Sequence, residues 1–520
     1  MLHVCSLCVN TVIIMVAKIK TVSFSGITTL PIEVEVHIAG GLPAFTIVGL
    51  PDKAVAESKE RVRAALHAMG LALPPKRITV NLAPADVNKE GSHYDLPIAL
   101  GLLVAMEAVA ADAVADFIAL GEMGLDGGLR AVSGVLPAAM HAIDHDQGII
   151  CPNDCRNEAA WSGSNSILAP RNLLQLINHL KGTQVIDEDV RPMTYQEQQS
   201  DYSKNISDIK GQETAKRALE IAAAGRHNMM LSGQPGSGKS MLAERLPTIL
   251  PELSAKEALD ISMIHSLAGT LPDDGLVKIR PFRNPHHSAS LPALIGGGTR
   301  AKPGEISLAH KGVLFLDELP EFNRATLEAL RQPMETREAV IARVQSRATY
   351  PADFQLIAAM NPCRCGYMGS PDHECRCNPN SVAQYQGKIS GPFMDRVDLF
   401  VDVPPVAVSD LRGGGGDGED SAVVRHRVER AYDIQHARLG TGRLNMDMST
   451  QEIEKHCVMD AQANEFFDQA IDKLKLSARG YYRVLKVART IADLDGGADV
   501  LSKHHVSEAL SFRPRTYLNT

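Results

Sequence analysis

Short apolar runs bounded by polar residues mark the second half of the chain. They occupy residues 227–232, 312–316 and 354–360. Continuous apolar runs of this length predict strands buried on both faces, as in a parallel sheet. Residues 241–250, which follow the first run, carry apolar residues at helical spacing. This half of the chain is therefore expected to be an α/β domain built on a parallel sheet.

The N-terminal third has a different pattern. Alternation of apolar and polar residues predicts strands, whereas apolar residues at helical spacing predict helices. The predicted strands span residues 21–24, 32–38, 43–51 and 78–82, and the predicted helices span residues 55–69 and 96–110. We expect a separate α/β domain of hairpins and helices in this part of the chain.

Length indicates how many domains to expect. At 520 residues the chain is too long for a single hydrophobic core, so about two to four domains are expected. We predict a disordered or misassigned start at residues 1–15, the first α/β domain at 16–182, a polar linker at 183–205, the parallel-sheet domain at 206–405, and a glycine-rich hinge with a helical C-terminal lid at 406–520.

A glycine-rich motif of the form G-x-x-x-x-G-K-S lies between the first apolar run and the helix after it. Glycines let the backbone wrap around a triphosphate, so that its N–H groups and the helix N-terminus face the anion. We expect Lys239 to reach the β- and γ-phosphates and Ser240 to hold Mg²⁺. The alternative is a glycine-rich turn that matches by chance. The predicted ATP-binding residues are Gly233, Gln234, Pro235, Gly236, Ser237, Gly238, Lys239 and Ser240.

Each of the other two apolar runs ends in polar residues that suit ATP hydrolysis. Asp317 and Glu318 follow the second run, and Asn361 follows the third. Ligands bind parallel sheets at the carboxyl ends of their strands. We expect Asp317 to hold Mg²⁺ and Glu318 to polarise the attacking water. Asn361 is expected to orient that water against the γ-phosphate, and the alternative is a turn residue before a proline.

A cysteine cluster follows the third run directly. Its pattern is C-x-C…C-x-C within residues 363–377, and His373 is a spare ligand. Four thiolates satisfy a tetrahedral Zn²⁺ site, which would fold the loop without taking part in chemistry. The alternatives are reduced free thiols or a redox pair. The predicted zinc ligands are Cys363, Cys365, Cys375 and Cys377.

Composition narrows the class of protein. Apolar residues make up 44% and charged residues 22%, as in soluble globular proteins, and the net charge is −8. This charge argues against a surface that is basic throughout, although not against a local basic channel. We see neither an apolar run of transmembrane length nor a basic segment typical of a signal peptide. A cytoplasmic protein without membrane segments is therefore expected.

Two segments of the N-terminal domain, residues 89–96 and 121–129, resemble the Lon-protease-like (ribosomal S5 domain 2-like) fold. A Lon-type site pairs a serine with a lysine that acts as base. That lysine would fall within residues 132–137, which contain none. Ser92 is therefore expected to be a helix N-cap rather than a nucleophile, and the domain to bind or scaffold rather than to cleave peptides.

The segments Phe282–Ser290, 296–298, Pro303–His310 and Pro392–Leu399, together with the motifs above, resemble the ComM/YifB family of Mg-chelatase-like AAA+ ATPases, from residue 16 to nearly the end of the chain. The resemblance implies a homo-oligomeric ring, a hexamer, with nucleotide at each subunit interface. Arg396 is then the candidate arginine finger; its alternative is an ion pair with Asp395 or Asp398. Arg479 is the candidate sensor 2, with Arg483 as the fallback.

The same resemblance implies a DNA-stimulated helicase that drives branch migration in recombination and natural transformation. One alternative is a protein-remodelling or metal-chelatase-type ATPase. Another is an ATP-dependent protease, which the missing lysine argues against.

DNA contact is expected along a basic insertion at residues 255–312, although a solvated insertion explains the same charges equally well. Its basic residues are Lys278, Arg280, Arg283, His286, His287, Arg300, Lys302 and His310. The lid could line the same channel through Arg425, Arg427, Arg430, Arg438 and Arg443.

Overall fold

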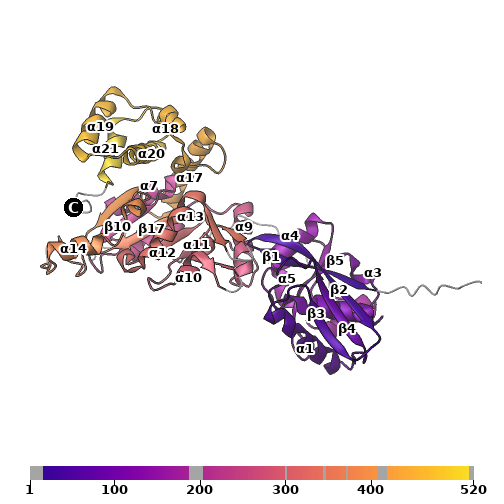
Figure 1. The fold of residues 1–520 in the computed structure, drawn as a ribbon. Helices are drawn as coiled ribbons and strands as arrows, with labels where there is room; N and C mark the ends of the chain where they lie inside the picture. The colour runs from indigo at the N-terminus through magenta and orange to yellow at the C-terminus, as the bar shows by residue number, and fades with distance from the viewer. Residues whose placement is uncertain are drawn as a thin grey trace, which may run out of the picture. The chain divides into compact units, whose positions relative to one another are not determined.

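The computed structural model describes residues 16–186, 203–298, 301–342, 347–369, 373–406 and 418–513 (Figure 1). The chain forms two compact units. The first consists of residues 1–195 and 262–277, and the second of residues 196–261 and 278–520. The predicted start at 1–15, residues 187–202 of the predicted linker and residues 413–416 of the predicted hinge lie outside the described residues. The other predicted domain boundaries stay predictions.

The first unit contains a mixed sheet with the strand order β3-β4-β2-β1-β5-β8-β9. Strands β1, β2 and β4 pair antiparallel, and the remaining neighbours pair parallel. The strands of the unit are β1 (Ala17–Ser25), β2 (Thr28–Ala39), β3 (Ala44–Val48), β4 (Arg77–Ala83), β5 (Phe117–Ala119), β6 (Glu122–Met123), β7 (Leu129–Arg130), β8 (Gly148–Ile150) and β9 (Ile167–Leu168). The predicted strands and hairpins of this region are confirmed.

Its helices are α1 (Lys53–Ala68), α2 (Asp95–Ala105), α3 (Asp112–Ala115), α4 (Val135–Asp144), α5 (Arg156–Ala160) and α6 (Leu173–Leu180). Both predicted helices are confirmed. The strongly apolar one, α2, is buried from Asp95 to Val104, which explains why its sequence lacks a polar face.

The predicted N-cap role of Ser92 is wrong. The short helix Ser92–Tyr94 has Gly91 as its N-cap and no capping side chain. The Ser92 hydroxyl donates instead to the Glu122 carboxylate. The likeness of the first unit to the Lon-protease-like fold stays a prediction.

The first unit also takes in part of the insertion that the sequence associates with nucleic acid. Helix α9 (Ala255–Ala268) contains the division between the units. The Ser266 hydroxyl donates to Glu158 Oε1 at 2.5 Å, and Trp161 Nε1 donates to Asp274 O at 2.8 Å. Burial raises the pKa of Glu158. Residues 262–277 are therefore structural members of this unit.

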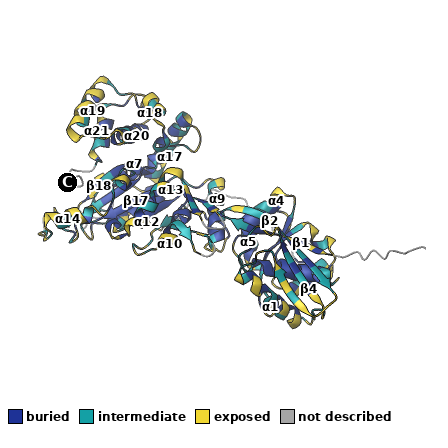
Figure 2. Cartoon of the chain, viewed as in Figure 1, coloured by how far each residue is buried: buried dark blue, intermediate teal, exposed yellow. Residues whose placement is uncertain are grey.

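The second unit contains the predicted parallel sheet, in the order β11-β14-β17-β10-β18. These strands are β10 (Met229–Gly233), β11 (Phe282–Arg283), β14 (Val313–Leu316), β17 (Gln355–Met360) and β18 (Leu399–Val403). All residues of β14 and β17 are buried, as their apolar runs predict (Figure 2). The hairpins β12 (Gly296–Gly297) with β13 (Lys302–Pro303) and β15 (Glu338–Ala342) with β16 (Arg347–Pro351) lie outside this sheet.

The helices of the second unit include α7 (Glu213–Gly225), α8 (Lys239–Ile249), α10 (Leu291–Ile295), α11 (Glu305–Leu308), α12 (Arg324–Ala329), α13 (Arg331–Thr336), α14 (Pro379–Gln386) and α15 (Gly391–Met394). The predicted helical lid is formed by α17 (Ser421–Leu439), α18 (Thr450–His456), α19 (Ala461–Leu474), α20 (Ala478–Leu494) and α21 (Lys503–Ser511).

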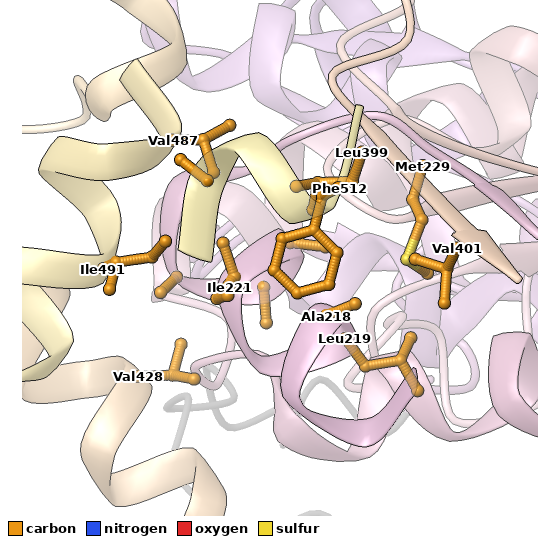
Figure 3. Close-up of a cluster of buried hydrophobic side chains, with 14 of the residues drawn as sticks. Ala218, Leu219, Ile221, Met229, Leu399, Val401, Val428, Val487, Ile491 and Phe512 are labelled. Atoms are coloured by element: carbon orange, nitrogen blue, oxygen red, sulfur yellow. The ribbon is translucent and has the colours of Figure 1, made fainter. Parts of the chain in front are cut away.

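One hydrophobic core joins the sheet to the lid (Figure 3). Met229 and Val401 of the sheet, Ile221 of α7 and Val487 of α20 belong to this cluster. The end of the chain is attached by Phe512, whose carbonyl accepts from the Phe400 N–H at 2.8 Å. The lid is thus packed directly against the elements that carry the glycine-rich motif. Within the described residues, no helix combines the length and hydropathy needed to cross a bilayer.

Candidate nucleotide site and cysteine cluster

The glycine-rich motif turns from β10 into α8. Gly236 and Gly238 adopt φ of 77° and 89°, and Gly238 is the N-cap of α8. Left-handed backbone favours glycine because a Cβ would be strained there. Gln212 steadies the turn, since its Nε2 donates to Ser237 O at 2.6 Å. The first N–H groups of α8 are thus available to an anion, as the motif predicts.

Lys239 and Asn361 meet across the end of the sheet. Lys239 Nζ donates to Gly233 O and Gln234 O at 2.8 Å each, and to Asn361 Oδ1 at 3.2 Å. Burial lowers the pKa of Lys239. Its ammonium is satisfied by groups that a phosphate could replace. The predicted sensor residue therefore lies beside the predicted phosphate-binding lysine.

Ser240 and Asp317 also lie together. Ser240 Oγ donates to Asp317 Oδ2 at 2.8 Å. Hydroxyl and carboxylate oxygens are ligands that Mg²⁺ accepts. Ser240 lies in the first turn of α8 and Asp317 follows β14, so two distant segments bring their oxygens together. This arrangement fits a Mg²⁺ site beside a triphosphate.

Glu318 pairs with His287, a residue of the insertion that was expected to contact DNA. Its backbone is left-handed, with φ of 51°, and its N–H donates to Asp317 Oδ1 at 2.8 Å. His287 Nδ1 lies 3.2 Å from Glu318 Oε2. His287 follows β11, which pairs with β14, so its place after a neighbouring parallel strand was the signal that could have found it.

A cavity of about 990 Å³ adjoins the glycine-rich motif. Its walls come from the start of α7, the end of β10, the segment after β17, strand β18 with the prolines after it, and the end of α21. Its lining includes Gln212, Gly233, Gln234, Met368, Pro404 and Arg513. Gln212, which also bonds the glycine-rich turn, is therefore part of the pocket wall.

Arg513 is a lining residue that no sequence pattern indicated. Its guanidinium carbon lies 5.9 Å from the centre of the Phe400 ring. Its Nε and Nη1 are buried and have no hydrogen-bond partner among the described residues. Burial, with Arg483 nearby, lowers the pKa of Arg513.

The candidate arginine finger and sensor 2 have partners within the chain. Arg396 Nη1 donates to Pro392 O at 2.6 Å, and its Nη2 pairs with Glu335 rather than with Asp395 or Asp398, the alternative partners. Arg479 is 68% exposed and lies 3.6 Å from Asp395.

The fallback, Arg483, pairs with Asp398 at 3.6 Å. Burial is the main cause that lowers the pKa of Arg483, and the positive charges of Arg479 and Arg396 lower it further, whereas Asp398 and Asp395 raise it. These arginines and aspartates therefore lie in one region.

Several residues of the predicted basic insertion have partners within the chain. Arg280 donates to Lys311 O at 2.8 Å, and Arg283 binds Glu305 through two bonds of 2.6 and 2.9 Å. Burial lowers the pKa of His310 to about 4. Arg280, Arg283 and His310 therefore contact other parts of the chain. Arg300 lies outside the described residues, and Lys302 is exposed on the β12–β13 hairpin.

The lid arginines are also mostly paired. Arg425, Arg427, Arg438 and Arg443 form ion pairs with Glu252, Glu220, Asp493 and Glu452 in that order. Only Arg430 of the predicted set has no such pair among the described residues. Four of the five arginines are therefore paired within the chain, and their contact with DNA stays a prediction.

The four predicted zinc ligands come together. Their Sγ atoms all lie within 4.8 Å of one another, so the group could hold a metal ion; the group is Cys363, Cys365, Cys375 and Cys377. His373 is not in this group, and its ring lies 4.8 Å from that of Tyr367. Cys151, Cys155 and Cys457 are buried elsewhere.

Comparisons with known proteins agree with this architecture. The family model described as "Magnesium chelatase, subunit ChlI" matches residues 205–411, "Subunit ChlI of Mg-chelatase" matches 34–155, and "Magnesium chelatase, subunit ChlI C-terminal" matches 418–513. The competence protein ComM of Haemophilus influenzae is 44% identical over 496 residues, which cover 94% of this chain and 95% of that protein. The chain belongs to the ComM/YifB family of Mg-chelatase-like AAA+ proteins.

Other relatives differ in how much of the chain they match. YifB of Salmonella typhimurium, described as uncharacterized, is 43% identical over 498 residues, which cover 96% of this chain and 97% of that protein. The magnesium-chelatase 67 kDa subunit of Chlorobaculum parvum is 28% identical over 160 residues, which cover 30% of this chain and 23% of that protein. The match to ComM and YifB therefore spans both units, whereas the match to this 67 kDa subunit covers less than a third of the chain.

Proposed function

We propose that this ComM/YifB family member is an ATP-hydrolysing ring motor that acts on DNA. The proposed activity is that of a helicase that promotes branch migration in homologous recombination and natural transformation. The observation that carries ATP hydrolysis is the hydrogen bond between Ser240 and Asp317, with Lys239 and Glu318 at the same end of the sheet. The DNA substrate is supported by the name of the competence protein ComM, a relative over nearly the whole chain.

In the proposed reaction Lys239 exchanges the carbonyls of Gly233 and Gln234 for the β- and γ-phosphates of ATP. Ser240 and Asp317 would hold Mg²⁺, which neutralises charge on the phosphates. Glu318 accepts a proton from the attacking water, and Asn361 orients that water. The adenine would lie in the cavity beside Gln212.

Subunit contacts complete this proposal. We propose a homo-oligomer, a hexamer by family resemblance, in which Arg396 stabilises the γ-phosphate at the neighbouring site. Arg479 is the proposed sensor 2; its side chain is largely exposed, and it would exchange its contact with Asp395 for the nucleotide. For Arg396, its pair with Glu335 has to open first.

Removal of the His287 side chain tests how Glu318 is held. His287→Ala is expected to lower kcat for ATP about tenfold with little change in KM, because an unsupported carboxylate samples positions away from the water. Steady-state ATP hydrolysis measures both constants. His286→Ala is the matched control, since the His286 ring bonds Ser288 rather than Glu318. Equal loss in both variants would remove His287 from this role.

Branched DNA tests the proposed substrate. The ATPase rate is expected to rise several-fold with forked or four-way DNA and less with plain duplex, measured at about 0.1 M salt so that phosphate contacts are not exaggerated. Intact basal hydrolysis without any response to DNA would favour a protein-remodelling or metal-chelatase-type ATPase. That second candidate is supported by the local match to a magnesium-chelatase subunit.

A further inference from the structure

We propose that the cysteine cluster binds Zn²⁺ and that the metal-bound loop forms a wall of the nucleotide pocket, so that affinity for ATP depends on the metal. This inference rests on the proposed ATP site. The cysteine cluster is defined as Cys363, Cys365, Cys375 and Cys377.

The sulfur positions suit a tetrahedral ion. Cys363 Sγ lies 3.3 Å from Cys365 Sγ and 3.7 Å from Cys375 Sγ, and Cys365 and Cys375 are also 3.7 Å apart. A tetrahedron with Zn–S bonds of about 2.3 Å has edges of about 3.8 Å. Thiolates are soft ligands, which favour zinc over magnesium or calcium. The cluster is therefore already close to the geometry of a structural zinc site.

The ligands connect two elements of the ATPase core. Cys363 is fully buried and lies two residues beyond Asn361, at the end of β17. Cys377 lies directly before Asn378, the N-cap of α14. Helix α14 is also tied to the first pair, because Gln386 Nε2 donates to Pro362 O at 2.8 Å. A metal ion would join β17, the strand that precedes Asn361, to this helix.

The loop between the two cysteine pairs touches the glycine-rich motif. Gly366 is left-handed, with φ of 86°, and a Cβ added there would lie 2.5 Å from Pro235 Cδ and 2.7 Å from Pro235 Cγ. The backbone of the loop therefore packs directly against Pro235. Two and three residues further on, Met368 and Gly369 line the cavity together with Gly233.

This packing gives the metal a consequence for nucleotide binding. The described part of the loop contains no helix or strand, so its order depends on few backbone hydrogen bonds. Metal ligation can supply the constraint that such a loop lacks. Loss of the ion would free Gly366 from Pro235 and remove a wall of the pocket, whereas the strands and helices of the sheet would remain.

Zinc content and nucleotide affinity test both parts of the proposal on the full chain. We expect about one zinc ion per chain by elemental analysis. Chelation, or Cys375→Ser, should remove the zinc and raise the Kd for a fluorescent ATP analogue about tenfold or more. Added Zn²⁺ should restore affinity to the chelated protein, whereas Mg²⁺ alone should not, because Mg²⁺ prefers oxygen ligands.

Gly366→Ala tests the contact without changing a ligand. The new methyl group collides with Pro235, so the variant should keep its zinc yet bind the analogue several-fold more weakly. Gly442→Ala is the matched control: Gly442 has a similar φ of 81°, nothing lies within 4 Å of its added Cβ, and it is in the lid. That variant should match the wild type in zinc and in affinity.

The possible results separate this proposal from the ATP site on which it rests. Wild-type protein that lacks zinc would overturn the metal site. Zinc-free protein with an unchanged Kd, or Gly366→Ala with normal affinity, would overturn the link to the pocket. Wild-type, zinc-loaded protein that binds no ATP analogue would instead overturn the proposed ATP site. Should Cys375→Ser fail to fold, the chelation and Gly366→Ala results still decide the matter.

Discussion

Lys239→Ala is expected to abolish ATP turnover and to weaken ATP binding by about 100-fold or more, because a charge-assisted contact to two phosphates is lost. The fold should survive. Among the described residues the ammonium bonds to the carbonyls of Gly233 and Gln234 and to Asn361, and other side chains form the apolar core. ATP hydrolysis and nucleotide titration measure the first effect, and thermal unfolding measures the second.

Met241→Ala is the matched control for this variant. Met241 lies on the same helix, two residues further along, and is 44% exposed. Its truncation should change neither turnover nor the melting temperature by more than a small amount, since exposed positions contribute little to stability. Retained turnover in Lys239→Ala would refute the assignment of the phosphate-binding loop.

Mixed subunits are expected to recover ATP hydrolysis that two variants lack separately. Glu318→Gln removes the proposed base, and Arg396→Ala removes the proposed finger. Each should lower kcat about 100-fold or more while nucleotide binding is kept. In a ring, an Arg396→Ala subunit still carries Glu318, and a Glu318→Gln neighbour still supplies Arg396. Random mixing therefore restores about a quarter of the interfaces.

The control for the mixing experiment is Lys239→Ala mixed with Glu318→Gln. Both changes lie in the same half of the proposed interface, so no combination rebuilds an active site and no recovery is expected. Absence of recovery in the Arg396→Ala mixture as well would identify Arg396 as a local partner of Glu335. In that case the melting temperature should fall in Arg396→Ala and in Glu335→Gln alike.

The elements of the nucleotide site follow from local sequence. Apolar runs fully buried in β14 and β17, and a turn whose glycines are left-handed, can be predicted because their physics is contained in a few adjacent residues. The meeting of Ser240 with Asp317 follows from topology, since carboxyl ends of parallel strands share one edge. The close grouping of the cysteines was likewise predictable, because two tight C-x-C pairs were separated by a short loop.

The partners of charged side chains could not be predicted in the same way. Arg283 and Arg427 have the appearance of nucleic-acid contacts in the sequence, yet each binds a carboxylate that lies on another element. An ion pair depends on which residues the fold brings within about 4 Å, and local patterns carry no information on that. The same reason explains why Ser92 binds Glu122 instead of capping a helix.

By itself, therefore, the sequence determined the parallel sheet, the glycine-rich turn, the acidic strand end and the thiol cluster, because each is a local pattern with its own chemistry. Only the tertiary structure decided that His287 lies against Glu318, that Arg513 lines the cavity beside the glycine-rich motif, and that Gly366 packs on Pro235. These contacts join residues far apart in the chain, and long-range packing alone sets which side chains meet.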